Sequence, residues 1–146
     1  GARAKEAVTF LWENGLQAAL ACAPGLQGLT LTYHDACHLA HGQGVRQPPR
    51  QLLASIPGVQ LVELAESDTC CGSAGIYNLT QPRRARALLD RKWNHVRQTG
   101  AQLVATGNPG CLAWITQAAR EADSPIEVRH TLDVLESAFS GLRPLF

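Results

Sequence analysis

Four of the chain's five cysteines have neighbours and spacings that suit a metal or iron–sulfur site. Cys37 lies in Tyr-His-Asp-Ala-Cys-His, Cys70 and Cys71 begin a Cys-Cys-Gly word, and Cys111 ends Asn-Pro-Gly-Cys. Each segment follows a predicted strand, and a parallel sheet would bring all three to the same edge. Thiolates that converge in this way can ligate an iron–sulfur cluster or zinc. Cys22, in Ala-Cys-Ala-Pro, belongs to no such group.

The spacing of the cysteines favours a cluster over a single ion. Cys37 and Cys70 are separated by 32 residues, and Cys71 and Cys111 by 39, whereas zinc fingers and ferredoxins use closely spaced ligands. The side chains of Cys70 and Cys71 diverge in extended backbone, so both would reach one tetrahedral ion with difficulty. A cluster with several irons gives each thiolate its own target. Gly72 lets a backbone N–H group approach sulfur closely.

Three other interpretations of these residues stay open. Free cysteines are often simply buried, so the thiols could be structural. Three cysteines with His34 or His38 could bind zinc. Because both histidines flank Cys37, a catalytic Cys–His pair is conceivable, although it leaves the other cysteines unexplained. As neighbours of a cluster, His34 and His38 would donate hydrogen bonds to sulfur; otherwise they are a turn and a helix-cap histidine.

Alternating strands and helices position these residues. The pattern predicts strands at 29–33, 59–64, 103–106 and 126–128. It predicts helices at 4–21 with an interruption at Gly15, and at 50–56, 82–98, 112–122 and 132–139, with Thr80 as a cap for the longest. We therefore expect an α/β fold, a three-layer αβα arrangement with a mainly parallel sheet of about four strands. Residues 1–24 are expected to be an N-terminal helix that could link to an upstream domain.

The longest predicted helix is strongly basic. We expect its charges to form a solvated face, with a docking patch for an acidic partner as the alternative. Its basic residues are Arg83, Arg84, Arg86, Arg91, Lys92 and Arg97. The sequence indicates no partner for His95 or His130.

Composition limits the class of protein. With 146 residues, 45% of them hydrophobic and 17% charged, the chain is expected to be one globular domain. A formal net charge of +1 argues against nucleic-acid binding, and no apolar run has the length of a transmembrane segment. Nothing indicates secretion, so we expect reduced cysteines and not a disulfide framework. The chain has no Met, which suggests part of a longer protein.

The three cysteine-bearing words together resemble the cysteine-rich CCG domain family. That family occurs in heterodisulfide reductase, anaerobic glycerol-3-phosphate dehydrogenase, lactate-utilisation proteins and the glycolate oxidase iron–sulfur subunit. The words are most similar to the C-terminal CCG domain of the last of these, over about residues 30–137. The resemblance implies a [4Fe-4S] cluster on Cys37, Cys70, Cys71 and Cys111, although some CCG domains hold zinc. Asn108 stands where the family has the first cysteine of a final Cys-x-x-Cys.

The resemblance also implies a place in a larger assembly. We expect an electron-transfer domain without catalytic residues, in which His34, His38, Gly72 and Asn108 lie beside the cluster. FAD would be bound by flavoprotein subunits that oxidise glycolate or another 2-hydroxy acid, and electrons would pass towards a quinone-type acceptor. The expected location is the cytoplasm, with peripheral association at the inner face of the cytoplasmic membrane through the complex. A structural or docking domain that holds zinc or no metal is the alternative.

Overall fold

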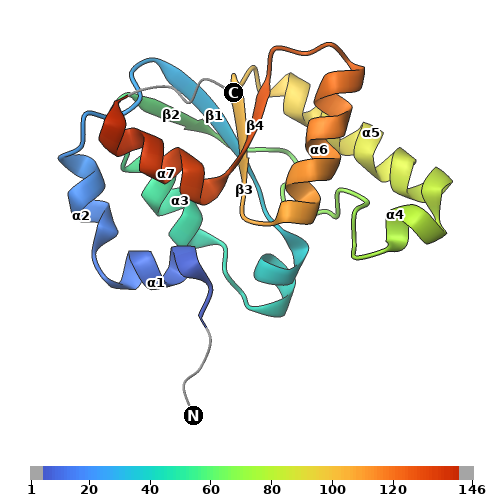
Figure 1. Ribbon diagram of the computed structural model, residues 1–146, viewed down its shortest axis with the longest axis horizontal. Coiled ribbons are helices and arrows are strands. Elements are labelled where there is room, and N and C mark those ends of the chain that lie inside the picture. The colour runs from blue at the N-terminus through green and yellow to red at the C-terminus, as the bar shows by residue number, and fades with distance from the viewer. Residues whose placement is uncertain (1–4, 142–146) are drawn as a thin grey trace.

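The computed structural model describes residues 5–141, in which strands and helices alternate along most of the chain (Figure 1). The strands are β1 (Leu29–His34), β2 (Val59–Val62), β3 (Leu103–Thr106) and β4 (Glu127–His130). The helices are α1 (Ala7–Glu13), α2 (Leu16–Ala21), α3 (Gln47–Ala54), α4 (Tyr77–Thr80), α5 (Pro82–Gln98), α6 (Pro109–Glu121) and α7 (Thr131–Ser140). A short π-helical turn, η1 (His38–Gly42), follows β1.

The strands form one parallel sheet in the order β2-β1-β3-β4. At its centre, His34 at the end of β1 pairs in register with Thr106 at the end of β3. Thr106 in turn pairs with His130 at the end of β4. Because every strand runs the same way, the segments that follow β1, β2 and β3 leave from one edge of the sheet. The predicted α/β class and parallel sheet are confirmed.

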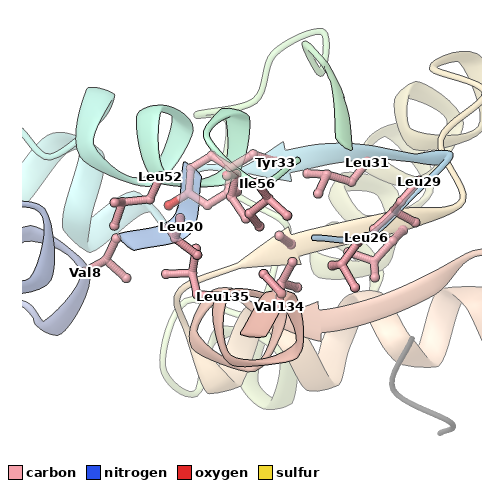
Figure 2. Close-up of a cluster of buried hydrophobic side chains, with 14 residues drawn as sticks. Val8, Leu20, Leu26, Leu29, Leu31, Tyr33, Leu52, Ile56, Val134 and Leu135 are labelled. Atoms are coloured by element: carbon pink, nitrogen blue, oxygen red, sulfur yellow. The ribbon is translucent and has the colours of Figure 1, made fainter. Parts of the chain in front are cut away.

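One face of the sheet is covered by α1, α2, α3 and α7 (Figure 1). Alternate residues of β1 point to this side, so Leu29, Leu31 and Tyr33 join the hydrophobic core there. Figure 2 shows these side chains packed with Val8 of α1 and Val134 of α7. This first core layer contains no cysteine.

A second core layer lies between the sheet and helices α5 and α6. Leu89 and Trp93 of α5 meet Ile115 of α6, and Val104 of β3 contributes from the sheet. Cys71 and Cys111 are members of this cluster, so the metal-ligand candidates belong to the second layer together with apolar residues. Helices on both faces confirm the three-layer αβα arrangement.

The N-terminal region and α3 differ in detail from the predicted helices. The first helical segment is two helices, α1 and α2, separated at Gly15, whose φ is 80°. Residues 1–4 of that predicted segment lie outside the described residues. Helix α3 begins at Gln47, three residues before the predicted start, and takes both Pro48 and Pro49 into its first turn.

Thr80 does not cap the long helix, so that prediction is wrong. Thr80 is the last residue of α4, and its hydroxyl donates back to the carbonyl of Ile76 at 3.3 Å. Gln81 occupies the cap position of α5 and makes no side-chain cap bond. Pro82 at the first helical position removes one of the N–H groups that a cap would satisfy.

The described helices also bear on membrane insertion. Across residues 5–141, no helix has both the length and the hydropathy required to cross a bilayer.

Candidate metal centre

Three segments carry cysteines to the carboxyl edge of the sheet. Cys37 follows β1 and lies directly before the first residue of η1. Cys111 follows β3 and lies in the first turn of α6. Cys70 and Cys71 lie in the connection between β2 and α4. This is the position at which α/β sheets place their ligand sites, as the sequence predicted.

His34, Cys71 and Cys111 form a compact group of potential ligands. One donor atom from each residue lies within 4.8 Å of the other two. All three residues are buried, with exposed fractions of 1%, 1% and 5%. Imidazole nitrogen and thiolate sulfur are ligands that zinc and iron–sulfur centres accept, whereas magnesium and calcium require oxygen.

His34 is a buried polar residue whose hydrogen-bonding capacity is unused. Within the described residues, neither Nδ1 nor Nε2 has a well-formed hydrogen bond. Buried polar atoms of this kind are rare in native proteins and usually indicate an absent ligand, ion or water. The ring nevertheless lies close enough to Cys71 to favour its thiolate. The His34 side chain is therefore available to a group bound between it and the cysteines.

Cys71 and Cys111 interact directly and titrate as a pair. A hydrogen bond from Cys111 lowers the pKa of Cys71, while burial opposes this effect. The same hydrogen bond, together with burial, raises the pKa of Cys111. The pair therefore favours one thiolate and one thiol in the absence of metal, and a bound cation would replace the shared proton.

Cys37 and Cys70 lie around this group without belonging to it. Both are half-buried. Charge on either of them would add to the raised pKa of Cys111, so all four sulfurs lie close enough to interact electrostatically. The N–H group of Gly72 donates to Cys70 Sγ at 3.3 Å, which is the kind of approach expected for that glycine. Whether it tunes a cluster stays a prediction.

Two glycines allow the cysteine segments to pack closely. Gly72 has a φ of 95°, and a Cβ atom there would lie 2.4 Å from the carbonyl oxygen of Ala85 in α5. A Cβ atom at Gly110 would lie 2.8 Å from Ser73 Oγ, across the contact between α6 and the Cys-Cys-Gly turn. At Gly72 the obstacle is backbone, so only glycine fits without displacing α5, whereas a side chain at Gly110 would require Ser73 to change its rotamer.

Asn108 and His38 lie at the mouth of the site. Asn108 Oδ1 accepts a hydrogen bond from the N–H group of Cys111 at 3.0 Å and so caps α6. Asn108 Nδ2 lies 3.4 Å from His38 Nδ1. Asn108 therefore orients Cys111, and His38 is not a member of the group formed by His34, Cys71 and Cys111 among the described residues. His34 likewise associates with Cys71 and Cys111, which weighs against a catalytic pair of His34 with Cys37.

A buried ion pair supports the segment before the cysteine pair. Asp35, next to His34, receives two hydrogen bonds from Arg50 of α3, at 2.8 and 2.6 Å. Burial would raise the pKa of Asp35, but hydrogen bonds from Arg50 and Ser67 outweigh it and lower that pKa. Arg50 also donates to Ser67 Oγ at 3.2 Å and stacks 5.1 Å from the Tyr33 ring centre. No pattern in the sequence indicated this network.

The basic residues of α5 form the predicted solvated face with one exception, because Arg83, Arg84, Arg86, Arg91 and Arg97 are exposed and Lys92 is not. Lys92 is only 2% exposed. Arg86 pairs with Asp90 and Glu121 instead of facing solvent alone. The buried stripe of α5 recurs at helical spacing and includes Lys92, a signal that the composition of the helix obscured. Its members are Ala85, Leu89, Lys92, Trp93 and Val96.

Two histidines without an expected partner have one. His95 Nε2 lies 3.5 Å from a carboxylate oxygen of Glu66. His130 Nδ1 accepts a hydrogen bond from the N–H group of Leu132 at 3.3 Å and so caps α7.

The chain is similar in sequence to known proteins over most of its length. Residues 31–116 match the family described as the cysteine-rich domain, CCG. The chain is 46% identical over 110 residues to the "Probable glycolate oxidase iron-sulfur subunit" of Bacillus subtilis, covering 74% of this chain and 25% of that protein. It is 32% identical over 111 residues to lactate utilization protein A of Oceanobacillus iheyensis, covering 76% and 46%.

A third relative comes from Methanothermobacter marburgensis. Over 113 residues the chain is 36% identical to a subunit of the fumarate reductase (CoM/CoB) of that organism, covering 77% of this chain and 23% of that protein. The chain thus spans less than half the length of each of these relatives.

Proposed function

The chain belongs to the cysteine-rich CCG domain family, and from this premise we propose that it is an iron–sulfur electron-transfer domain. The observation that carries the proposal is the buried group of His34, Cys71 and Cys111, whose donor atoms lie within 4.8 Å of one another. Relatives named as an iron–sulfur subunit and as a fumarate reductase subunit support the same assignment.

We assign the ligands to the four clustered cysteines. Cys37, Cys70, Cys71 and Cys111 would hold a [4Fe-4S] cluster with one thiolate for each iron. The buried ring of His34 supports a group bound at this place, because its nitrogens make no well-formed hydrogen bond and Cys71 is the polar group beside it.

The residues around the cysteines would control the properties of the site. A bound cluster would supply a one-electron relay. The Gly72 N–H group stabilises negative charge on Cys70 Sγ, and Asn108 holds the first turn of α6 so that Cys111 faces the site. His34 would donate a hydrogen bond to sulfur, while His38 lies outside with Asn108.

We also propose a larger complex for the chain, by analogy with its relatives. The chain would be one domain of a longer subunit that works with FAD-containing flavoprotein subunits oxidising glycolate or another 2-hydroxy acid. It would pass electrons towards a quinone-type acceptor and have no catalytic residue of its own. Such a complex would lie in the cytoplasm or peripherally on the inner face of the membrane.

The test is iron and acid-labile sulfide content, with EPR after reduction, on chain reconstituted anaerobically. We expect about four irons and four sulfides per chain for a [4Fe-4S] cluster. The Cys71→Ser variant should lose or perturb the signal, because Cys71 is buried in the site. Cys22→Ser is the matched control, because Cys22 is exposed and apart from the site. Wild-type chain that takes up no iron would contradict the proposal.

Zinc is the second candidate, because His34, Cys71 and Cys111 already approximate three ligands of a tetrahedral site. In that case the domain would be structural or serve for docking. One zinc per chain, no visible absorbance, and loss of the metal in His34→Ala would favour this function.

A further inference from the structure

A buried ammonium group lies behind the cysteine pair. Lys92 projects from the inner side of α5 and is 2% exposed, although the helix around it is rich in solvent-facing arginines. Its Nζ donates to the backbone carbonyl of Glu66 and lies 3.4 Å from the carbonyl oxygen of Ser67. Lys92 is therefore part of the protein interior, beside the segment that leads to Cys70.

The charge of Lys92 lacks a carboxylate partner. Within the described part of the chain, no Asp or Glu oxygen lies at ion-pair distance from its Nζ, and Glu66 directs its carboxylate to Arg91 and His95. Burial lowers the pKa of Lys92, and the largest opposing influence is the negative charge of Cys71. A buried cation is tolerated when anions compensate it, and here the negative charge of Cys71 has the largest such effect, followed by the more distant carboxylates of Glu66, Asp68 and Asp35.

The carbonyl groups that Lys92 holds belong to a strained turn. Glu66 has a φ of 52°, which is uncommon for a residue with a side chain. The carbonyl oxygen of Ser67 also accepts a hydrogen bond from the N–H group of Asp35 at 3.1 Å. Lys92 from α5 and Asp35 from the end of β1 thus fix the turn three residues before Cys70.

We propose that Lys92 is a positioning residue of the metal centre, which fixes the turn at 66–67 and offsets the negative charge of the bound thiolates. The identity of the metal is taken from the proposed function, but we expect any metal bound by thiolates at this site to require Lys92. Among the described residues, the hydrogen bonds of Lys92 Nζ go to the carbonyl groups of Glu66 and Ser67 and not to a cysteine sulfur, so Lys92 acts through the turn and through its charge.

Cadmium binding to the reduced, metal-free chain tests the proposal. Sulfur-to-cadmium charge-transfer absorbance measures Kd without iron or sulfide. We expect Lys92→Met, which keeps the length and removes the charge, to raise the Kd by about tenfold or more, as loss of an outer partner commonly does. Arg84→Met is the matched control. It removes the same charge from an exposed residue about two turns earlier in α5, away from the turn at 66–67, and should change the Kd less than about twofold.

A variant that keeps the charge separates the effect of the charge of Lys92 from the effect of its packing. Lys92→Arg should bind cadmium more tightly than Lys92→Met, and far-UV circular dichroism should show that all three variants are folded. The proposal is overturned if Lys92→Met binds as tightly as Arg84→Met, or if folded Lys92→Arg is as weak as Lys92→Met. If Lys92→Met does not fold, Lys92→Gln replaces it as the neutral variant, and cadmium binding by folded Lys92→Gln as tight as that of Arg84→Met overturns the proposal.

The reduction potential provides a second readout. In reconstituted chain, removal of a nearby cation should move the midpoint reduction potential to more negative values in Lys92→Met but not in Arg84→Met, because the reduced centre carries more negative charge. An unchanged midpoint in Lys92→Met would count against the charge role. Wild type that fails to take up iron while its cadmium affinity still depends on Lys92 would refute the proposed function and leave this inference standing.

Discussion

At the scale of single residues, Asp35 links the end of β1 to the segment before the cysteine pair. Its carboxylate is buried and bound by Arg50, while its N–H group holds the Ser67 carbonyl. A buried pair of this kind contributes little compared with an apolar contact, but the loss of one partner leaves the other charge uncompensated. Asp35 therefore matters for stability even though it is no metal ligand.

Asp35→Asn should lower the free energy of unfolding at neutral pH by about 3 kcal/mol, because it leaves Arg50 half-paired. The pKa of Asp35 is lowered in the folded chain, so its contribution is present above the unfolded value of about 3.9 and is lost as pH falls through the folded pKa. The stability gap between wild type and variant should therefore close on acidification. Urea unfolding at a series of pH values measures it.

Asp68→Asn is the matched control for this variant. Asp68 pairs with Arg46 at 2.9 Å, but both side chains are exposed, so its loss should change stability little. A gap for Asp35→Asn that stayed constant down to about pH 2 would show that the carboxylate charge is not responsible.

The sequence predicted the positions of the cysteines in the fold better than the burial of the residues around them. The spacing of Cys37, Cys71 and Cys111 after strands was sufficient to place them at one edge. His34 had a readable signal, since strand alternation puts it on the opposite face from Leu31 and Tyr33, towards a covered layer. The burial of residue 92 was not anticipated, because lysine is almost never fully buried and the basic composition of α5 suggested solvent.

At the scale of elements, the Cys-Cys-Gly turn depends on contact with α5. Gly72 combines a left-handed backbone with a close approach to the Ala85 carbonyl, so it fixes the distance between the turn and the helix. The same turn touches α6 at Gly110 through Ser73. These two contacts hold the cysteine segments together without any sulfur bond.

Gly72→Ala should destabilise the chain by at least about 2 kcal/mol, because it adds backbone strain to a steric overlap with Ala85. Thermal and urea unfolding measure this change, and metal uptake should fall with it. Gly75→Ala is the matched control from the same turn: its φ is also positive, at 63°, but its Cβ would meet nothing within 4 Å. Equal losses in the two variants would show that strain alone acts and that the contact with α5 is unimportant.

Elements with a clear apolar pattern were predicted more accurately than elements without one. The predicted bounds of β3 and α5 match the structure, because β3 is a short apolar run and α5 has a long helical stripe of apolar residues. The turn η1 and helix α4 were not predicted. Their five and four residues are too few for a periodic signal, and tertiary packing decides their conformation.

At the scale of the whole molecule, the sheet separates a purely hydrophobic layer from the layer that contains the cysteines. Val8, Leu52 and Val134 belong to the first (Figure 2), and Cys71 and Cys111 to the second. Because the ligands come from the connections after three different strands, metal binding should strengthen the fold as a whole and not one loop.

Cadmium at a free concentration about 100 times its Kd should raise the stability of the reduced chain by about 2.7 kcal/mol, provided that the unfolded chain binds it weakly. The midpoint of thermal unfolding should rise accordingly. Cys22→Ser should show the full increase and Cys71→Ser much less. An increase that is the same in both variants would mean that cadmium binds elsewhere.

The separation of the two layers has a consequence for the order of maturation. Apolar contacts, together with the Arg50–Asp35 pair, hold α1, α2, α3 and α7 on the sheet, so we expect this half to form without a metal. The other half can then open and close locally while its partner remains intact. We therefore expect a newly made chain to fold before its metal is inserted. We also expect it to stay largely folded when oxidants remove the metal, and so to escape degradation.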